Sequence, residues 1–188
     1  MSKANYKKAD IASIILFAQK GDIRAMEELI KKTQKEVYAI FAHLCDKKED
    51  VSDLTQDALL KMAKSLHMLK DSTRFKPWLN QIVVNIYNDY LRKKPSEIFD
   101  YDEEKIKLIK DKMGCEPGEK CLFAEFEKLV KVALMTLPKD LRLTIVLREY
   151  EGLSYEDIAK ITNTAIGTVK SRISRARLRL QQELKDFI

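Results

Sequence analysis

Glycine and proline are scarce in this sequence. The 188 residues include only 5 Gly and 4 Pro, too few for the many tight turns of a β-sandwich or β-barrel. Hydrophobic residues make up 45% and charged residues 34%, a balance that supports a packed core and argues against disorder throughout. The composition therefore predicts long helices, in one or two domains for a chain of this length.

Long apolar runs are also missing. No stretch approaches the roughly 20 residues that span a bilayer, and the N-terminus lacks the apolar region of a secretory signal, so we expect a cytoplasmic protein without membrane insertion. Cys45, Cys115 and Cys121 are odd in number and form no CxxC. We interpret them as reduced thiols, with Cys45 in the core and a Cys115–Cys121 redox pair as the alternative.

Motifs of catalysis and cofactor binding are absent as well. His43 and His67 are the only histidines, and the chain contains no GxxxxGK[ST], GxGxxG or HExxH. Its acidic residues are plentiful, but none are spaced as a metal site or a carboxylate dyad. The sequence predicts neither an enzyme nor a bound metal or cofactor.

The charges that are present are distributed unevenly. The formal net charge is +6 and the pI is about 9.1. Residues 1–95 carry a net +6, residues 96–122 a net −3, and residues 123–188 a net +3. This pattern predicts two basic modules joined by a flexible acidic linker, and a basic balance is compatible with nucleic acid or an anionic membrane surface.

The first module has the apolar spacing of helices throughout. Apolar residues recur at intervals of 3, 4 and 7 over 11–18, 26–44, 51–66 and 75–91. Gly21 and Asp22 are expected to end the first helix and cap the second, and Pro77 to lie in the first turn of the fourth. Trp78 fits a core anchor better than a base-stacking platform.

The C-terminal module has the pattern of a helix-turn-helix. Ser154 and Asp157 form an acidic variant of the capping box ahead of a short apolar helix. Asn163 tolerates the left-handed backbone that a tight turn needs, and a second helix is predicted from about Ile166 to Leu180.

The second of these helices is strongly cationic. Between Thr164 and Leu180 there is no acidic residue, whereas a solvated helix usually mixes both signs. Its five basic residues are Lys170, Arg172, Arg175, Arg177 and Arg179. These five cations repel one another, and a bound polyanion would relieve that repulsion. DNA binding is therefore favoured over a solvated face or a membrane-type or calmodulin-type helix. We expect the N-terminal half to meet base edges, and Arg177 and Arg179 to meet phosphates.

These residues carry a resemblance to a known family. The C-terminal module resembles region 4 of bacterial sigma factors of the extracytoplasmic function group, and the first module is similar to region 2. The motifs for region 4 are Leu147-Arg148-Glu149, Gly152-Leu153-Ser154-Tyr155-Glu156-Asp157 and Gly167-Thr168-Val169-Lys170-Ser171-Arg172. Those for region 2 are Asp53-Leu54-Thr55-Gln56-Asp57 and Phe75-Lys76-Pro77-Trp78-Leu79. Thr162, Asn163 and Thr164 depart from the family's turn, which is usually apolar with a glycine.

The resemblance implies an all-α fold and three surfaces. Core RNA polymerase would contact Asp53, Leu54, Gln56, Asp57 and Leu60, although Leu54 fits a core position equally well. The −10 element would contact Lys70, Ser72, Arg74, Asn85, Asn88 and Arg92. The −35 element would contact Lys170, Ser171, Ser174 and Arg175, with Arg148 and Thr168 on phosphates.

The resemblance also implies partners beyond promoter DNA and core RNA polymerase. An anti-sigma factor is expected, since this group is commonly held inactive by one. The acidic linker would act as an RNA mimic in a cationic channel of the polymerase. The alternative is an ordinary helix-turn-helix regulator whose N-terminal module senses a ligand or dimerises, which explains residues 150–180 equally well but not the region 2 motifs.

Overall fold

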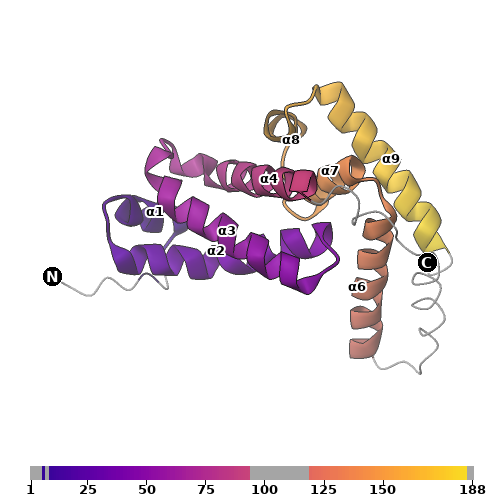
Figure 1. Ribbon diagram of the computed structural model, residues 1–188, viewed down its shortest axis with the longest axis horizontal. Helices are drawn as coiled ribbons and strands as arrows, with labels where there is room; N and C mark the ends of the chain where they lie inside the picture. Colours follow the sequence, from indigo (N-terminus) through magenta and orange to yellow (C-terminus); the bar gives the residue numbers. More distant parts are fainter. Residues whose placement is uncertain (1–5, 7–8, 94–118, 186–188) are drawn as a thin grey trace. The chain divides into compact units, whose positions relative to one another are not determined.

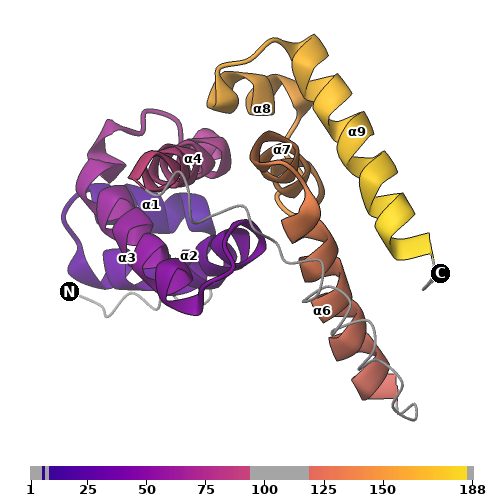
Figure 2. The same cartoon turned by 45° about the vertical axis from the view of Figure 1, so that its right-hand side comes forward.

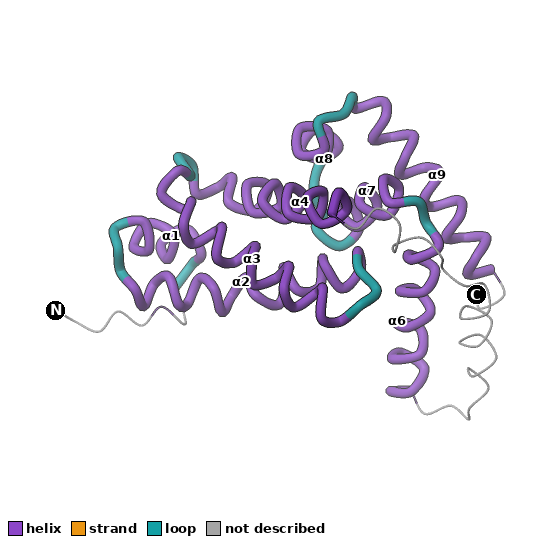
Figure 3. The backbone as a smooth tube through the Cα atoms, viewed as in Figure 1, coloured by secondary structure: helices purple, strands orange, loops and turns teal. Residues whose placement is uncertain are grey.

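The computed structural model describes residue 6 and residues 9–93 and 119–185. Within these ranges the regular secondary structure is helical (Figure 3), which confirms the predicted all-α class. The chain divides into two compact units, the first formed mostly by residues 1–89 and the second mostly by residues 90–188. The predicted linker up to residue 118 lies outside the described ranges.

The described part of the first unit contains four α-helices. They are α1 (Ile11–Gln19), α2 (Ile23–Leu44), α3 (Lys48–Ser65) and α4 (Phe75–Lys93), with short 3-10 turns at Leu66–Met68 and Ser72–Arg74 between α3 and α4 (Figure 1). The helices bury the apolar stripes that the spacing predicts. Fully buried side chains include Ile14, Ile15, Leu29, Ile40, Phe41, Met62, Leu66 and Tyr87.

The junction between α1 and α2 confirms the predicted stop and cap. Gly21 has a φ of +87°, a conformation that glycine adopts without the steric cost of a Cβ. The Asp22 carboxylate accepts hydrogen bonds from the backbone N–H groups of Arg24 and Ala25, at 2.9 and 3.1 Å. Tyr6 donates its hydroxyl proton to the same carboxylate at 2.7 Å, so Asp22 caps α2 and also binds the Tyr6 side chain.

The connection from α3 to α4 is fixed by two polar side chains. The Gln19 amide donates to the carbonyl oxygens of Leu66 and Leu69, at 2.9 and 2.7 Å. The Asp71 carboxylate accepts from the backbone N–H of Thr73 at 2.9 Å. Helix α4 then begins at Phe75, and Pro77 lies in its first turn as predicted. The loop that was expected to meet DNA is thus an ordered turn.

The second unit contains α6 (Glu119–Thr136), α7 (Lys139–Glu149), α8 (Tyr155–Thr162) and α9 (Ile166–Leu184). Helix α6 begins four residues before the predicted domain start at 123. Helix α6 ends at Thr136, two residues before Pro138, which cannot continue a helix. Helix α9 contacts each of the other three helices described for this unit, and Figure 2 shows α8 beside its N-terminal end.

None of the described helices is both long and apolar enough to cross a membrane. Cys45 is buried and forms no disulfide with another described residue, and its burial confirms the predicted core position. The Cys115–Cys121 pair cannot be compared with the prediction, since Cys115 and the side chain of Cys121 lie outside the described part of the chain.

Candidate nucleic-acid interface

The turn between α8 and α9 is held by local hydrogen bonds. Ser154 caps α8, accepting from the backbone N–H of Asp157 at 3.0 Å and donating to its carboxylate at 2.8 Å. Asn163 has φ 51° and ψ 48°, the left-handed conformation predicted for it. The Thr162 hydroxyl bonds to the Ile158 carbonyl at 2.7 Å and lies 2.9 Å from the Thr164 hydroxyl. Paired hydroxyls thus occupy positions where the resembled family has apolar side chains.

Helix α9 has one buried face and one exposed face. Val169, Ile173 and Ala176 are at most 1% exposed, and they pack against the rest of the unit. The opposite face is exposed and bears four of the predicted −35 residues. These are Lys170, Ser171, Ser174 and Arg175. Thr168 is half-buried beside them.

Three of the predicted −35 residues are linked along α9. The Arg175 guanidinium donates to the Ser171 carbonyl at 3.3 Å and to its hydroxyl at 3.5 Å. The Ser171 hydroxyl donates to the Thr168 carbonyl at 3.0 Å. These bonds orient Arg175 along the exposed face, where a planar guanidinium can address a guanine edge with two hydrogen bonds.

Two other arginines of α9 are engaged with α7. Arg172 donates to the Asp140 carboxylate at 2.6 Å. Arg177 donates to the Glu149 carboxylate through both Nε, at 3.1 Å, and Nη2, at 2.5 Å. Hydrogen bonding to Glu149 also raises the pKa of the Arg177 guanidinium. Neither pair is evident from the sequence, from which Arg177 was expected to meet phosphates.

Arg148, a predicted phosphate contact, has two interactions inside the second unit. Its guanidinium donates to the Leu153 carbonyl at 2.7 Å and lies over the Tyr155 ring, 4.7 Å from the centroid. Both contacts secure the loop that leads into α8. The side chain is half-buried, so it has a structural role, and its contact with a phosphate stays a prediction.

The predicted −10 residues lie at two places in the first unit. Lys70 and Arg74 are exposed in the turn before α4, and Ser72 is half-buried there. Asn85, Asn88 and Arg92 are exposed along α4, at the spacing of one helix face. The Gln81 amide donates to Asn85 at 3.1 Å, so Gln81 extends this stripe by one turn, although the sequence alone did not single it out.

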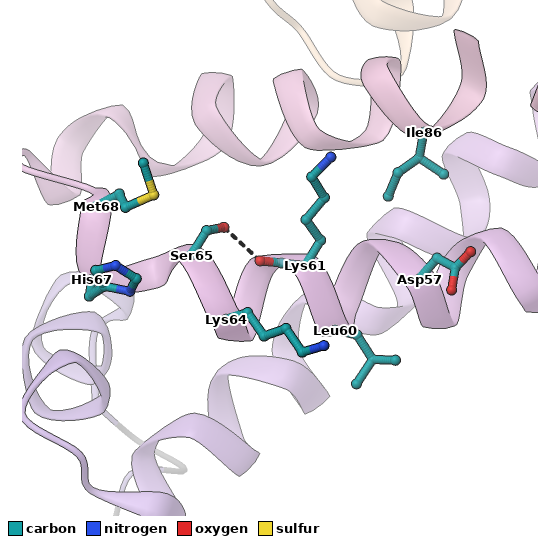
Figure 4. A pocket seen from close by; sticks show the side chains of 8 residues that line it. All are labelled: Asp57, Leu60, Lys61, Lys64, Ser65, His67, Met68 and Ile86. Atoms are coloured by element: carbon teal, nitrogen blue, oxygen red, sulfur yellow. Dashed lines mark hydrogen bonds between the residues drawn. The ribbon is translucent and has the colours of Figure 1, made fainter. Parts of the chain in front are cut away.

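The first unit also contains a groove that was not predicted from the sequence. It has a volume of about 420 Å³ and lies between α3, α4 and the turn at Leu66–Met68 (Figure 4). Its cationic members are Lys61 and Lys64 of α3, and one acidic residue, Asp57, also lines it. Its exposed apolar members are Leu60 and Met68, at 50% and 67%. Cations beside apolar surface match the phosphates and bases of a single strand. The signal in the sequence was the Lys61–Lys64 spacing on one helix face.

The residues predicted to contact core RNA polymerase lie along α3. Asp53, Gln56 and Asp57 are exposed, and Leu60 is 50% exposed. Gln56 and Leu60 line a second groove, of about 480 Å³, whose walls include Ile30, Gln34 and Tyr38 of α2. Leu54 is only 7% exposed and belongs to the core, so we leave it out of the proposed contact surface.

Trp78 is half-buried, with its ring 5.9 Å from that of the buried Phe75. It therefore anchors the start of α4 through part of its surface, in line with the favoured interpretation. Among the described residues there is no group of three or more His, Cys, Asp or Glu side chains placed to hold a metal ion.

Comparisons with known proteins match both units. The family model for sigma-70 region 2 matches residues 29–96, and that for sigma-70 region 4 matches residues 128–180. The ECF RNA polymerase sigma-E factor of Haemophilus influenzae is 34% identical over 176 residues, covering 90% of this chain and 93% of the relative. The protein of the same name in Escherichia coli K12 is 34% identical over 178 residues, covering 90% and 92%.

A solved sigma-factor structure is also similar to this chain. The sigma factor RpoE of Bartonella quintana, in complex with the anti-sigma factor NepR, aligns with a TM-score of 0.65 and 28% identity, covering 88% of this chain and 100% of that one. The chain belongs to the sigma-70 family and, within it, to the extracytoplasmic function group. It is a promoter-recognising sigma factor, and the match to region 2 displaces the alternative of an ordinary helix-turn-helix regulator.

Proposed function

We propose that the second unit reads the −35 element through the exposed face of α9. The observation that carries this assignment is the pairing on that helix. Arg172 and Arg177 are bonded to α7, whereas Lys170 and Arg175 lie on the exposed face with Ser171 and Ser174. A recognition helix that enters the major groove presents such a face to base edges.

The first unit reads and opens the −10 element in the same proposal. The turn 70–74 and the stripe of Asn85, Asn88 and Arg92 face the DNA, and the groove near Lys61 and Lys64 holds the separated strand. Unstacking a base costs a few kcal/mol, and stacking on apolar surface with phosphate neutralisation offsets that cost. Exposure of these side chains on one unit supports the assignment.

Core RNA polymerase binds along α3. A helix of the polymerase lies in the groove between α2 and α3, in a helix-in-groove contact. Leu60 fills an apolar position at its edge, and Asp53 and Asp57 supply charge nearby. The groove volume of about 480 Å³ and the 50% exposure of Leu60 support this assignment.

The test of the polymerase surface is co-migration with core polymerase on a sizing column. Leu60→Arg is expected to abolish co-migration, because a charge replaces the apolar contact. Ile23→Arg is the matched control, since Ile23 is 75% exposed and lies outside the groove. Equal co-migration of both variants contradicts the proposed surface.

The domain boundaries of this proposal are 1–95, 96–122 and 123–188, with the acidic connector occupying a cationic RNA channel of the polymerase. Its net charge of −3 supports the idea, because a growing transcript would have to displace it. Neutralising Asp100, Asp102, Glu103 and Glu104 is expected to change the ratio of abortive to full-length transcripts. An unchanged ratio rejects this role.

We further expect the protein to act in the cytoplasm, to have no catalytic activity of its own, and to be restrained by an anti-sigma factor. The Bartonella quintana relative was solved with such a partner. An anti-sigma factor that holds the protein inactive would suppress promoter-specific transcription when added in equal amount.

A further inference from the structure

The two ion pairs between α9 and α7 suggest a role that the DNA-binding assignment does not cover. Arg172 and Arg177 are separated by five positions on α9, about 7.5 Å along its axis. Their partners Asp140 and Glu149 are near opposite ends of α7, about 13.5 Å apart along that helix. The pairs therefore hold α9 at two well-separated points of α7.

The positions of these arginines around α9 strengthen the argument. At about 100° per residue, Arg172 lies about 60° to one side of Val169, and Arg177 about 80° to the other. Val169, Ile173 and Ala176 form the buried stripe between them. The pairs thus flank the apolar contact on both sides, where they resist rolling of α9 about its own axis.

The exposures of the paired side chains fit a bracing role. Arg172 is 20% exposed, while Asp140 is 67% exposed, so the arginine reaches its partner from a mostly covered position. Arg177 and Glu149 are 56% and 46% exposed, which makes theirs the weaker of the two pairs. With apolar packing alone, a small rotation of α9 about its axis would cost little free energy. Such a rotation would displace Arg175 from a base edge.

We infer that Arg172 and Arg177 are positioning residues, which set the orientation of α9 through Asp140 and Glu149 and do not contact DNA phosphates. This inference rests on the proposal that α9 reads the −35 element. It divides the cationic residues of α9 into a bracing pair and a reading set, although the sequence presents them as one continuous cationic run.

Salt dependence separates the two roles. Each phosphate contact contributes about 0.9 to the slope of log affinity against log salt. We would form holoenzyme with core polymerase and measure its binding to a promoter fragment selected by transcription, over a series of salt concentrations. Arg172→Ala is expected to weaken binding about two- to fivefold, the range of an exposed ion pair, with no change in slope. Lys170→Ala is the control, with a lower slope expected if Lys170 meets a phosphate, or a loss of sequence preference if it meets a base.

Variants of the acidic partner sharpen the test. Asp140→Asn leaves every cation of α9 in place and adds one unit of net positive charge. A phosphate-binding Arg172 would then be released and would bind DNA more tightly, whereas a positioning Arg172 loses its anchor and binding weakens. The exchanged pair, Arg172→Asp with Asp140→Arg, is expected to restore binding. Circular dichroism confirms that each variant is folded at the assay temperature.

A reduced slope in Arg172→Ala, tighter binding in Asp140→Asn, unchanged affinity in both, or failure of the exchanged pair to recover overturns the inference. Failure of the proposed function is recognised separately. In that case the unaltered protein directs no transcription from any fragment, or Arg175→Ala leaves promoter binding unchanged.

Discussion

Arg175 offers the most direct substitution on the proposed −35 surface. Its side chain is exposed on the face opposite Val169 and Ile173, and its guanidinium donates to Ser171 one turn earlier on the same helix. Replacement by alanine leaves no cavity and no buried charge. The free energy of unfolding should therefore change by no more than about 0.5 kcal/mol.

The effect on promoter recognition is expected to be much larger. A bidentate contact between a guanidinium and a base is worth about 1–3 kcal/mol of discrimination, or roughly five- to 150-fold in binding. Arg175→Lys should recover only part of this, because an ammonium group lacks the planar pair of donors. Substitution of Ser171 is expected to have a smaller effect, since it removes the orientation of Arg175 and leaves its charge.

The assay is initiation by the reconstituted holoenzyme on the promoter and on variants of each −35 base pair. Arg175→Ala should lose activity on the native promoter and lose its preference at one base pair. Arg24→Ala, an exposed arginine of the first unit, is the control. An equal loss on all sequences would mean a phosphate contact, and no loss would mean that another face of α9 meets DNA.

Three further predictions concern stability and strand separation. Ser154→Ala removes the cap of α8 and should lower the free energy of unfolding by about 1 kcal/mol, as measured by denaturant titration. An unchanged unfolding midpoint would contradict a stabilising role for this cap. The hydrogen bond from Tyr6, followed by that from Ala25, holds the pKa of Asp22 below its usual 3.8, so its cap stabilises the folded state at neutral pH and is lost as the pH falls through the lowered pKa. Asp22→Ala should therefore melt at a lower temperature than the unaltered protein at pH 7 but not in strong acid, and a constant difference would refute this. Lys61→Ala combined with Lys64→Ala should slow promoter opening, followed by permanganate footprinting, and leave duplex binding nearly unchanged; unaltered opening rates would exclude the groove.

Local chemistry was readable from the sequence wherever the interacting groups are close along the chain. The cap at Asp22, the proline in the first turn of α4, and the cap at Ser154 each involve partners within three residues. The left-handed Asn163 follows from its own tolerance of that conformation. The buried stripe of α9 follows from its helical spacing.

Contacts between distant residues were not readable. Arg172 and Asp140 are 32 positions apart, and Arg177 and Glu149 are 28 apart. The sequence of α9 shows five cations without showing which of them an acidic residue of α7 neutralises. Nothing in the sequence indicates the partners of Arg148, whose guanidinium donates to the Leu153 carbonyl and lies over the Tyr155 ring. Tertiary packing determines which residues pair in these contacts. It also places Leu54 in the core, a position that the sequence left open.

Transcription in vitro tests the central claim most directly. Core RNA polymerase purified from the source organism is incubated with a pool of genomic fragments, with and without the protein, and the transcripts are sequenced. We expect new transcripts whose start sites share −35 and −10 elements at a fixed spacing, and we expect Leu60→Arg to abolish them. An unchanged transcript set, together with failure of the protein to co-migrate with core polymerase, would contradict it.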